Sequence, residues 1–277
     1  MYKSPDACDI YIFKGYFGND GTPHINVNVK LSQNSKPYNI RFRIDTGKNS
    51  SSLSPETAKI LGIKDKERIN QPIIFTFGQP SEPPKTIHCP KGFQITPIPQ
   101  TTKEEAQIFI EHNMPNTLGT DILFKFFELT LNRTTIKLMW LNELNTEPTR
   151  QKFTPIAVKI PEFEIDKELM FGIDTGSPTS SLSHKDAKAL GIYQHSQDNP
   201  EGKYIGFKGE VSTKILKTPV ELFFTKHVNR PQRVMFKDGI IITENDDFPT
   251  LIGTDVLLSC FNLRINKSIV ELTVLKQ

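Results

Sequence analysis

The tripeptide Asp-Thr-Gly occurs twice in this chain of 277 residues, at positions 45–47 and 174–176. If the fold holds the two aspartates about 3 Å apart, both cannot ionise at low cost, and they share one proton over a range of pH. The ionised carboxylate then acts as a base on a bound water, while the protonated one donates to a carbonyl oxygen. Asp45 and Asp174 are therefore the candidate catalytic pair. Because water is the nucleophile in this chemistry, it implies no metal and no organic cofactor.

Both tripeptides lie in an internal repeat. Shifting the sequence by 174 − 45 = 129 positions aligns residues 45–63 with residues 174–192, with 12 identities in 19 positions. A second pair of blocks, 115–123 and 249–257, aligns at a shift of 255 − 121 = 134 positions. Only about five residues were therefore gained or lost between the blocks, which indicates two copies of one structural unit.

The repeat divides the chain into two lobes. The N-terminal lobe is predicted over residues 1–141 and the C-terminal lobe over residues 153–277. Residues 142–152 are polar and contain Pro148, as expected of an interlobe linker. With only two units, the pattern is typical of a duplicated domain and not of a solenoid.

The elements that must position the aspartates are mostly strands. Apolar and polar residues alternate before each tripeptide, which predicts a hairpin running into each Asp-Thr-Gly turn. A serine that can cap a helix follows each turn, and a glycine ends the segment, which predicts a short helix. The predicted strands are 25–31, 38–44, 156–160 and 169–173, and the predicted helices are 54–59 and 183–188.

The chain resembles the retropepsin-like and pepsin-like aspartic peptidase superfamily in three features. These are an apolar residue and Asp-Thr-Gly after a strand, a Ser-rich turn, and an apolar-Gly-x-Asp block further along the sequence. The resemblance implies an all-β, bilobed, pseudo-twofold acid-protease fold made of two retropepsin-like β-barrel lobes, each with six to eight strands. It also implies an aspartic endopeptidase in which one aspartate from each lobe activates water to hydrolyse a peptide bond. The partner would be an extended peptide or protein substrate, and the chain would act as a monomer with an intramolecular pseudo-dimer.

The resemblance also implies supporting roles for residues beside the aspartates. Thr46 and Thr175 would exchange hydroxyl hydrogen bonds between the lobes. Gly47 and Gly176 lack a Cβ that would obstruct the dyad. Ser177 follows its glycine as in the family, where that hydroxyl can bond the catalytic carboxylate. In the apolar-Gly-x-Asp blocks, Asp121 and Asp255 are expected at the start of a short helix, in a structural role.

Two positions make the halves unequal. Lys48 stands where the second half has Ser177. Its side chain either points along the surface of the turn or sits near the dyad, where its charge would stabilise the ionised state and shift the activity optimum to lower pH. Arg43 and Gly172 occupy matched positions that, by resemblance, border a substrate subsite. Arg43 is either a simple surface residue or the source of a preference for acidic side chains.

A hairpin that closes over the substrate, called a flap, is expected between the two blocks of each half. In the second half, residues 202–210 have the glycine spacing of a hairpin tip and include the substrate-binding candidates Gly206 and Phe207. In the first half, residues 73–78 are the nearest equivalent, followed by prolines. Residues 9–17 and 269–275 are expected to add strands to a sheet between the lobes.

Other readings stay open. A non-catalytic peptide-binding module would keep the same residues without the reaction. A domain-swapped dimer, in which each lobe pairs with one from another chain, is also compatible with the linker.

Composition excludes some classes of partner and site. A formal charge of +3, from 34 basic and 31 acidic residues, predicts neither nucleic acid nor a membrane as partner. No segment resembles a signal sequence or a membrane span. The three cysteines are far apart, which disfavours a disulfide framework and a zinc site. We therefore expect a cytoplasmic protein.

Overall fold

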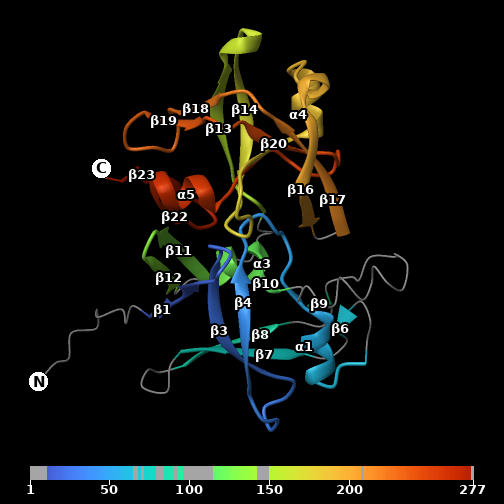
Figure 1. The fold of residues 1–277 in the computed structure, drawn as a ribbon. Coiled ribbons are helices and arrows are strands. Elements are labelled where there is room, and N and C mark those ends of the chain that lie inside the picture. Colours follow the sequence, from blue (N-terminus) through green and yellow to red (C-terminus); the bar gives the residue numbers. More distant parts are fainter. Residues whose placement is uncertain are drawn as a thin grey trace, which may run out of the picture.

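The computed structural model describes residues 11–64, 68–69, 72–78, 84–89, 93–95, 115–141, 150–206 and 209–275. Within these residues the protein is built mainly of β-strands, as predicted. The strands form two nine-stranded sheets, one in each half of the chain, and one five-stranded sheet (Figure 1). Each nine-stranded sheet exceeds the predicted six to eight strands because it includes pieces of only two or three residues around the Asp-Thr-Gly turns.

The first nine-stranded sheet belongs to the N-terminal half. Its strands run in the order β6-β9-β5-β10-β4-β3-β7-β8, and β2 pairs with β3 beside this path. Alternate residues of β3 are buried and exposed along most of its length, so the period-two sequence pattern produces the expected hairpin with β4. The bounds are β2 Tyr16–Phe17, β3 Pro23–Lys30, β4 Tyr38–Ile44, β5 Ser52–Leu53, β6 Arg68–Ile69, β7 Ile73–Phe77, β8 Lys85–Cys89, β9 Phe93–Ile95 and β10 Asn116–Leu118.

The second nine-stranded sheet belongs to the C-terminal half and repeats the order of the first. Its strands run β16-β17-β20-β15-β21-β14-β13-β18-β19. From β17 to β19, each strand has its counterpart at the same place in the first sheet, and β16 is an additional edge strand. The bounds are β13 Phe153–Ile160, β14 Ile165–Ile173, β15 Ser181–Ser183, β16 Gln197–Gly206, β17 Gly209–Leu216, β18 Val220–Phe224, β19 Gln232–Phe236, β20 Ile240–Thr243 and β21 Leu251–Ile252.

Helices occur at matched places in both halves. Helix α1 (Pro55–Ile60) is capped by Ser54 and α4 (His184–Ala189) by Ser183, each side chain accepting a backbone N–H of the first turn. Gly62 and Gly191 follow them with φ of 73° and 71°, a conformation that glycine adopts at little cost. Helices α3 (Thr120–Phe126) and α5 (Thr254–Cys260) each begin directly after a glycine. Short 3-10 turns cover Pro161–Phe163 and Tyr193–His195.

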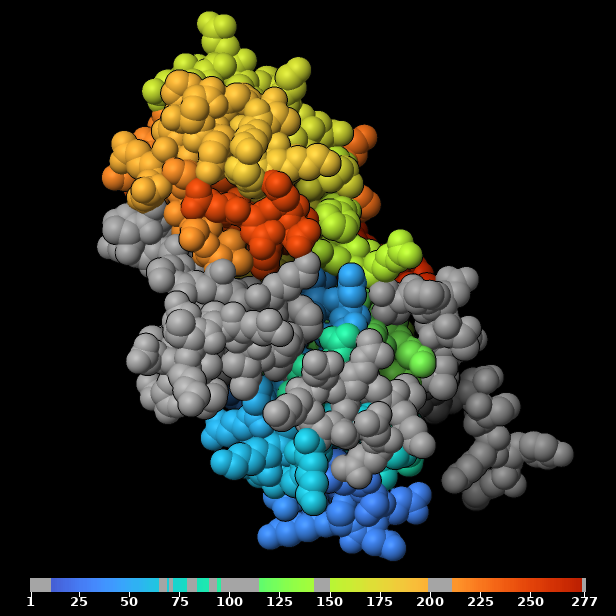
Figure 2. All heavy atoms as spheres, turned by 90° about the vertical axis from the view of Figure 1, so that its right-hand side faces the viewer, coloured from blue at the N-terminus to red at the C-terminus, as the bar shows by residue number. Residues whose placement is uncertain are grey.

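The five-stranded sheet joins the two halves. Its order is β1-β12-β11-β22-β23, so the central pair, β11 and β22, comes from opposite halves. The leading segment and the last strand form its edges, as predicted for residues 9–17 and 269–275. Figure 2 shows the second half at the top of the molecule and the first half at the bottom. The bounds are β1 Ile12–Lys14, β11 Phe127–Asn132, β12 Thr135–Trp140, β22 Phe261–Ile265 and β23 Val270–Val274.

The halves differ most where a flap was expected. Thirty residues, 190–219, separate α4 from β18, whereas twelve, 61–72, separate α1 from β7. The additional residues of the second half include the β16–β17 hairpin, whose strands pair as far as Gly206 and Gly209. In the described part of the first half, only the short strand β6 occupies the place of β17 in the sheet. The prediction that residues 73–78 form the first flap is wrong. Strand β7 pairs with β3 inside the sheet, and four of its five residues are buried.

Among the described residues, no helix has the length and apolar character needed to cross a lipid bilayer.

Candidate active site

Each Asp-Thr-Gly turn leaves the end of a long strand and is held by a neighbouring short one. Strand β10 runs parallel to β4, and β21 runs parallel to β14. The backbone N–H of Asp45 donates to Leu118 O at 3.0 Å, and that of Asp174 donates to Ile252 O at 3.0 Å. The apolar residue of each apolar-Gly-x-Asp block therefore anchors the aspartate of its own half.

The two turns meet through their threonines. The Thr46 hydroxyl donates to Ile173 O at 2.8 Å and accepts the N–H of Thr175 at 3.1 Å. The Thr175 hydroxyl donates to Ile44 O at 2.7 Å and accepts the N–H of Thr46 at 3.2 Å. Both threonines have no exposed surface. Four reciprocal hydrogen bonds thus lock the turns together, and the hydroxyls bond backbone of the opposite turn.

The two carboxyl groups lie together between the turns. A Cβ on Gly47 would be 2.3 Å from the Asp174 carboxyl carbon, and a Cβ on Gly176 would be 2.4 Å from that of Asp45. Each carboxyl group therefore rests against the glycine of the opposite turn, in space that a larger residue would fill. The carboxyl groups are hydrogen-bonded to each other. Both aspartates remain partly exposed, so a small molecule such as water has access to them.

The pKa of each aspartate is raised, but by different surroundings. Burial raises the pKa of Asp45, while the positive charges of Lys48 and Arg43 oppose that rise. Burial also raises the pKa of Asp174 well above its usual value, and the negative charge of Asp45 adds to the rise. Two carboxyl groups so placed disfavour each other's ionisation.

A buried serine–aspartate network supports each turn from behind. Asp121 accepts hydrogen bonds from the N–H of Ser51 at 2.9 Å and from its hydroxyl at 2.5 Å. Asp255 accepts from the N–H and hydroxyl of Ser180 at 2.9 and 2.7 Å. Each aspartate also accepts the N–H of the residue that follows it, in the first turn of α3 or α5. These carboxylates act as structural links at helix starts, as the sequence analysis expected.

The residues after the two glycines point to different partners. The Lys48 ammonium donates to the hydroxyl of Ser52 at 2.6 Å and lies close enough to Asp45 and Asp121 for both charges to raise its pKa. Burial outweighs them and lowers the Lys48 pKa to about 8. Ser177 donates its N–H to Asp174 at 3.1 Å, but its hydroxyl donates to Thr179 O at 2.7 Å. The expected bond from the Ser177 hydroxyl to the carboxylate is therefore not the one formed.

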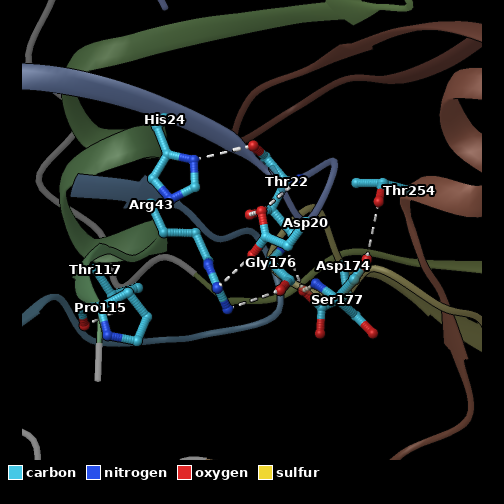
Figure 3. Close-up of polar contacts among 10 residues, drawn as sticks. All are labelled: Asp20, Thr22, His24, Arg43, Pro115, Thr117, Asp174, Gly176, Ser177 and Thr254. Carbon is cyan, nitrogen blue, oxygen red and sulfur yellow. Dashed lines mark hydrogen bonds and ion pairs between the residues drawn. The ribbon is translucent and has the colours of Figure 1, made fainter. Parts of the chain in front are cut away.

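Arg43 connects the first half to the second turn. Its guanidinium forms an ion pair with Asp20 at 2.8 Å and donates to Gly176 O at 3.3 Å (Figure 3). The side chain is 24% exposed, so the arginine is neither freely solvated nor buried. At the matched position, Gly172 leaves room for Gln151, because a Cβ there would lie 2.5 Å from the Gln151 amide nitrogen. Substrate contact by Arg43 or Gly172 stays a prediction.

Asp20 and Gln151 were not singled out by the sequence. Asp20 lies in the turn between β2 and β3, where it also accepts the N–H and hydroxyl of Thr22 at 3.1 and 2.7 Å. An Asp two residues before a threonine indicates a local turn, but gives no sign of an arginine 23 positions away. Gln151 falls in the predicted linker, where no pattern marks a contact.

The flap candidates lie at the end of the β16–β17 hairpin. Gly206 is the last residue of β16 and pairs with Gly209. Phe207 lies outside the described residues. In Figure 1 the hairpin extends from the second-half sheet toward the middle of the molecule, on the side opposite the five-stranded sheet. No group of three or more His, Cys, Asp or Glu side chains suited to a metal ion occurs in the described part of the chain.

Comparison with known proteins gives similar structures but no family match. No protein-family model matches the sequence, and no curated protein matches it. A retropepsin-like aspartic protease from Rickettsia conorii is similar in structure, with 20% identity, 50% of this chain and 97% of that chain covered, and a TM-score of 0.31. EIAV protease complexed with the inhibitor HBY-793 is also similar, with 22% identity, 42% and 90% covered, and a TM-score of 0.27.

Proposed function

We propose that this protein is an aspartic endopeptidase. The observation that carries the proposal is the pairing of Asp45 and Asp174, each carboxyl group resting against the glycine of the other turn. In this proposal a water bound between them is deprotonated by one carboxylate as it attacks the scissile carbonyl, whose oxygen takes a proton from the other. The threonine bonds between the turns keep the geometry that such a step requires.

The proposal includes the organisation of the chain. Residues 1–141 and 153–277 are two lobes that arose by duplication, joined by a linker at residues 142–152. The matching strand order of the two nine-stranded sheets supports this division. One chain then provides both aspartates, acts as a monomer, and binds an extended peptide or protein substrate along the dyad, covered by the β16–β17 hairpin.

Cleavage of an unfolded protein substrate tests the proposal. We expect the wild type to cleave at some pH between about 3 and 8, and Asp45→Asn and Asp174→Asn each to lower cleavage by about 10³-fold or more, since neither carboxyl group suffices alone. Asp238→Asn is the matched control, because Asp238 lies in an exposed turn, and it should leave the rate unchanged. Fragments are identified by mass spectrometry.

A wild type that cleaves nothing over this range, while still binding a peptide-like inhibitor such as pepstatin, would show a peptide-binding module instead. Cleavage that survives in both asparagine variants would place the reaction at another site.

A further inference from the structure

We propose that Arg43 is a positioning residue, which holds the second Asp-Thr-Gly turn in place from the first half of the chain. It acts through the backbone oxygen of Gly176, the residue that lies against both carboxyl groups. The inference rests on the proposed function, because the position of the turn affects a rate only if the pair reacts. It gives Arg43 a role within the protein, in place of the recognition of acidic substrate side chains.

Gly176 links the two aspartates. Its N–H donates to an Asp174 carboxyl oxygen at 2.8 Å. Its Cα lies against Asp45, since a Cβ there would be 2.4 Å from the Asp45 carboxyl carbon. Its backbone oxygen accepts a hydrogen bond from the Arg43 guanidinium at 3.3 Å (Figure 3). A change in the orientation of this one residue would therefore move the two carboxyl groups relative to each other.

The fold aims the Arg43 side chain at this oxygen. Arg43 lies two residues before Asp45, so alternation along the strand directs both side chains to the same face. One terminal nitrogen of the guanidinium pairs with Asp20 at 2.8 Å, and the other donates to Gly176. Because the guanidinium is planar and rigid, fixing one nitrogen on Asp20 also fixes the direction of the other.

The loop between β2 and β3 holds Asp20 in position. One carboxylate oxygen of Asp20 pairs with Arg43, and the other accepts the N–H and hydroxyl of Thr22. Thr22 and His24 are buried, and the His24 ring nitrogen Nδ1 lies 3.0 Å from Thr22 O. Gly18 allows this packing, since a Cβ there would lie 2.8 Å from the Asp20 carboxylate and 2.7 Å from the His24 ring. The ion pair therefore has a well-packed support.

The repeat shows that the arginine contact adds to the anchoring that both turns share. In each half, a threonine N–H at the helix start donates to the backbone oxygen of the residue after the glycine, at 2.8 Å in the first half and 2.9 Å in the second. The arginine contact is not repeated, because Gly172 stands at the matched position and has no side chain that could reach Gly47. Only the second turn is therefore held by this position of the opposite half.

The same contacts disfavour recognition of acidic substrate side chains by Arg43. Both terminal nitrogens already have acceptors within the protein, and Nε is buried. A substrate carboxylate would have to share the guanidinium with Asp20, whose charge already balances it.

The first test observes the contact itself and needs no cleavage. The dipeptide Gly-Ser occurs once in the sequence, at residues 176–177. Cell-free synthesis with glycine labelled by 13C at the carbonyl and serine labelled by 15N therefore gives one NMR signal, which links the Gly176 carbonyl carbon to the Ser177 N–H. We expect Arg43→Leu to shift this carbonyl signal, because the oxygen loses a charge-assisted hydrogen bond. Asp20→Asn should shift it in the same direction by less.

Arg41→Leu is the matched control for this test. Arg41 is an exposed arginine two residues earlier on the same face of β4, and its loss should leave the signal in place. If the signal of Arg43→Leu stays at the position found in Arg41→Leu, the contact does not hold the turn and the inference is wrong.

The second test measures peptide cleavage. Arg43→Leu should lower kcat by about ten- to a hundredfold with little change in KM, because a displaced turn disturbs the reacting geometry more than substrate binding. Arg43→Lys should recover only part of the loss, since an ammonium cannot span Asp20 and Gly176 as the guanidinium does. The double variant Arg43→Leu/Asp20→Asn should be no slower than Arg43→Leu, because the two residues act as one unit.

Two peptides that differ only by a glutamate in place of a glutamine separate this role from substrate recognition. We expect equal losses for both peptides. An unchanged kcat, or a loss confined to the KM of the acidic peptide, would overturn the inference, and the second result would make Arg43 a substrate contact. A wild type that cleaves nothing, while Arg43→Leu still shifts the Gly176 signal, would remove the proposed function and leave the contact between Arg43 and the second turn standing.

Discussion

Two buried hydroxyl groups hold the site together at the scale of single residues. Thr46 and Thr175 each donate to a backbone oxygen of the other half and accept a backbone N–H of the opposite turn. Both threonines are fully buried, so each hydroxyl satisfies one donor and one acceptor that would otherwise be buried alone. Their contribution is therefore both to stability and to the distance between the aspartates.

We predict that Thr46→Val, which keeps the side-chain shape, lowers the free energy of unfolding by about 2–4 kcal/mol, because two buried backbone groups lose their partners. Thr175→Val should do the same, and the two effects should not add, since the bonds belong to one network. Urea denaturation measures the change.

Thr46→Ser is the control for this prediction. It retains the hydroxyl and loses one methyl group, so about 1 kcal/mol is expected. A valine variant as stable as the serine variant would mean that the hydrogen bonds between the turns contribute little.

At the scale of elements, the two halves share a framework and differ in two connections. The connection from α4 to β18 in the second half is 18 residues longer than that from α1 to β7 in the first half. Conversely, 20 residues connect β9 to β10 in the first half, whereas 7 connect β20 to β21 in the second half, a difference of 13. These changes nearly cancel, which leaves the difference of five between the two shifts of the repeat. Within the described part of the chain, the β16–β17 hairpin of the second half is therefore the candidate for the covering role that we propose.

We predict that shortening this hairpin impairs substrate use without unfolding the protein. Replacing residues 199–212 by a four-residue Asn-Gly turn keeps Thr213–Leu216, which pair with β20. We expect kcat/KM to fall by about 10²-fold, because the substrate is no longer held over the aspartates, with thermal stability nearly unchanged.

The control is a shortening of another turn of the same sheet, the β13–β14 turn, in which residues 161–164 are replaced by Asn-Gly. Figure 1 places this turn at the far end of the second half, away from the middle of the molecule. Equal losses in both variants would argue against a covering role for the β16–β17 hairpin.

At the scale of the whole molecule, the five-stranded sheet determines how the halves meet. Beyond the β11–β22 pairing, Glu128 of β11 is buried and accepts from Arg264 at 2.8 Å and from Asn266 at 2.9 Å. Arg133 donates to the last carbonyls of α5, Leu258 O and Ser259 O, at 3.0 and 2.7 Å. A carboxylate with 7% exposure is costly to leave unpaired, so these contacts favour one relative orientation of the halves.

We predict that this sheet forms within one chain. Thr130 and Arg264 are direct partners across β11 and β22, close enough for a disulfide if both become cysteine. In a background with Cys8 and Cys260 changed to Ser, and with Glu128 changed to Gln so that the loss of Arg264 leaves no buried charge unpaired, oxidised Thr130→Cys/Arg264→Cys should run as a monomer on non-reducing electrophoresis. Light scattering should give the mass of one chain.

The single variant Thr130→Cys is the control for random cross-linking. A covalent dimer that forms in the double variant, and persists when the protein is diluted before oxidation, would support the domain-swapped alternative.

Local patterns account for the parts that were predicted from sequence. The alternating strands before Asp45 and Asp174, the serine caps and the glycines that end the helices depend only on residues a few positions away. The predicted hairpins before both turns and both short helices form. The first flap was misassigned because residues 73–78 have the apolar run and glycine of any hairpin. Only the pairing of β7 with β3 decides that they belong inside the sheet.

Sequence comparison alone establishes two similar segments with one Asp-Thr-Gly each, because 12 identities in 19 positions depend on no knowledge of the fold. That the two turns face each other follows from the folded structure, in which hydrogen bonds such as that from Thr46 to Ile173 join residues 127 positions apart. It also decided the direction of Lys48, whose ammonium bonds to the buried hydroxyl of Ser52. Local sequence patterns do not show such contacts, because they form only when strands that are distant in the sequence pack together.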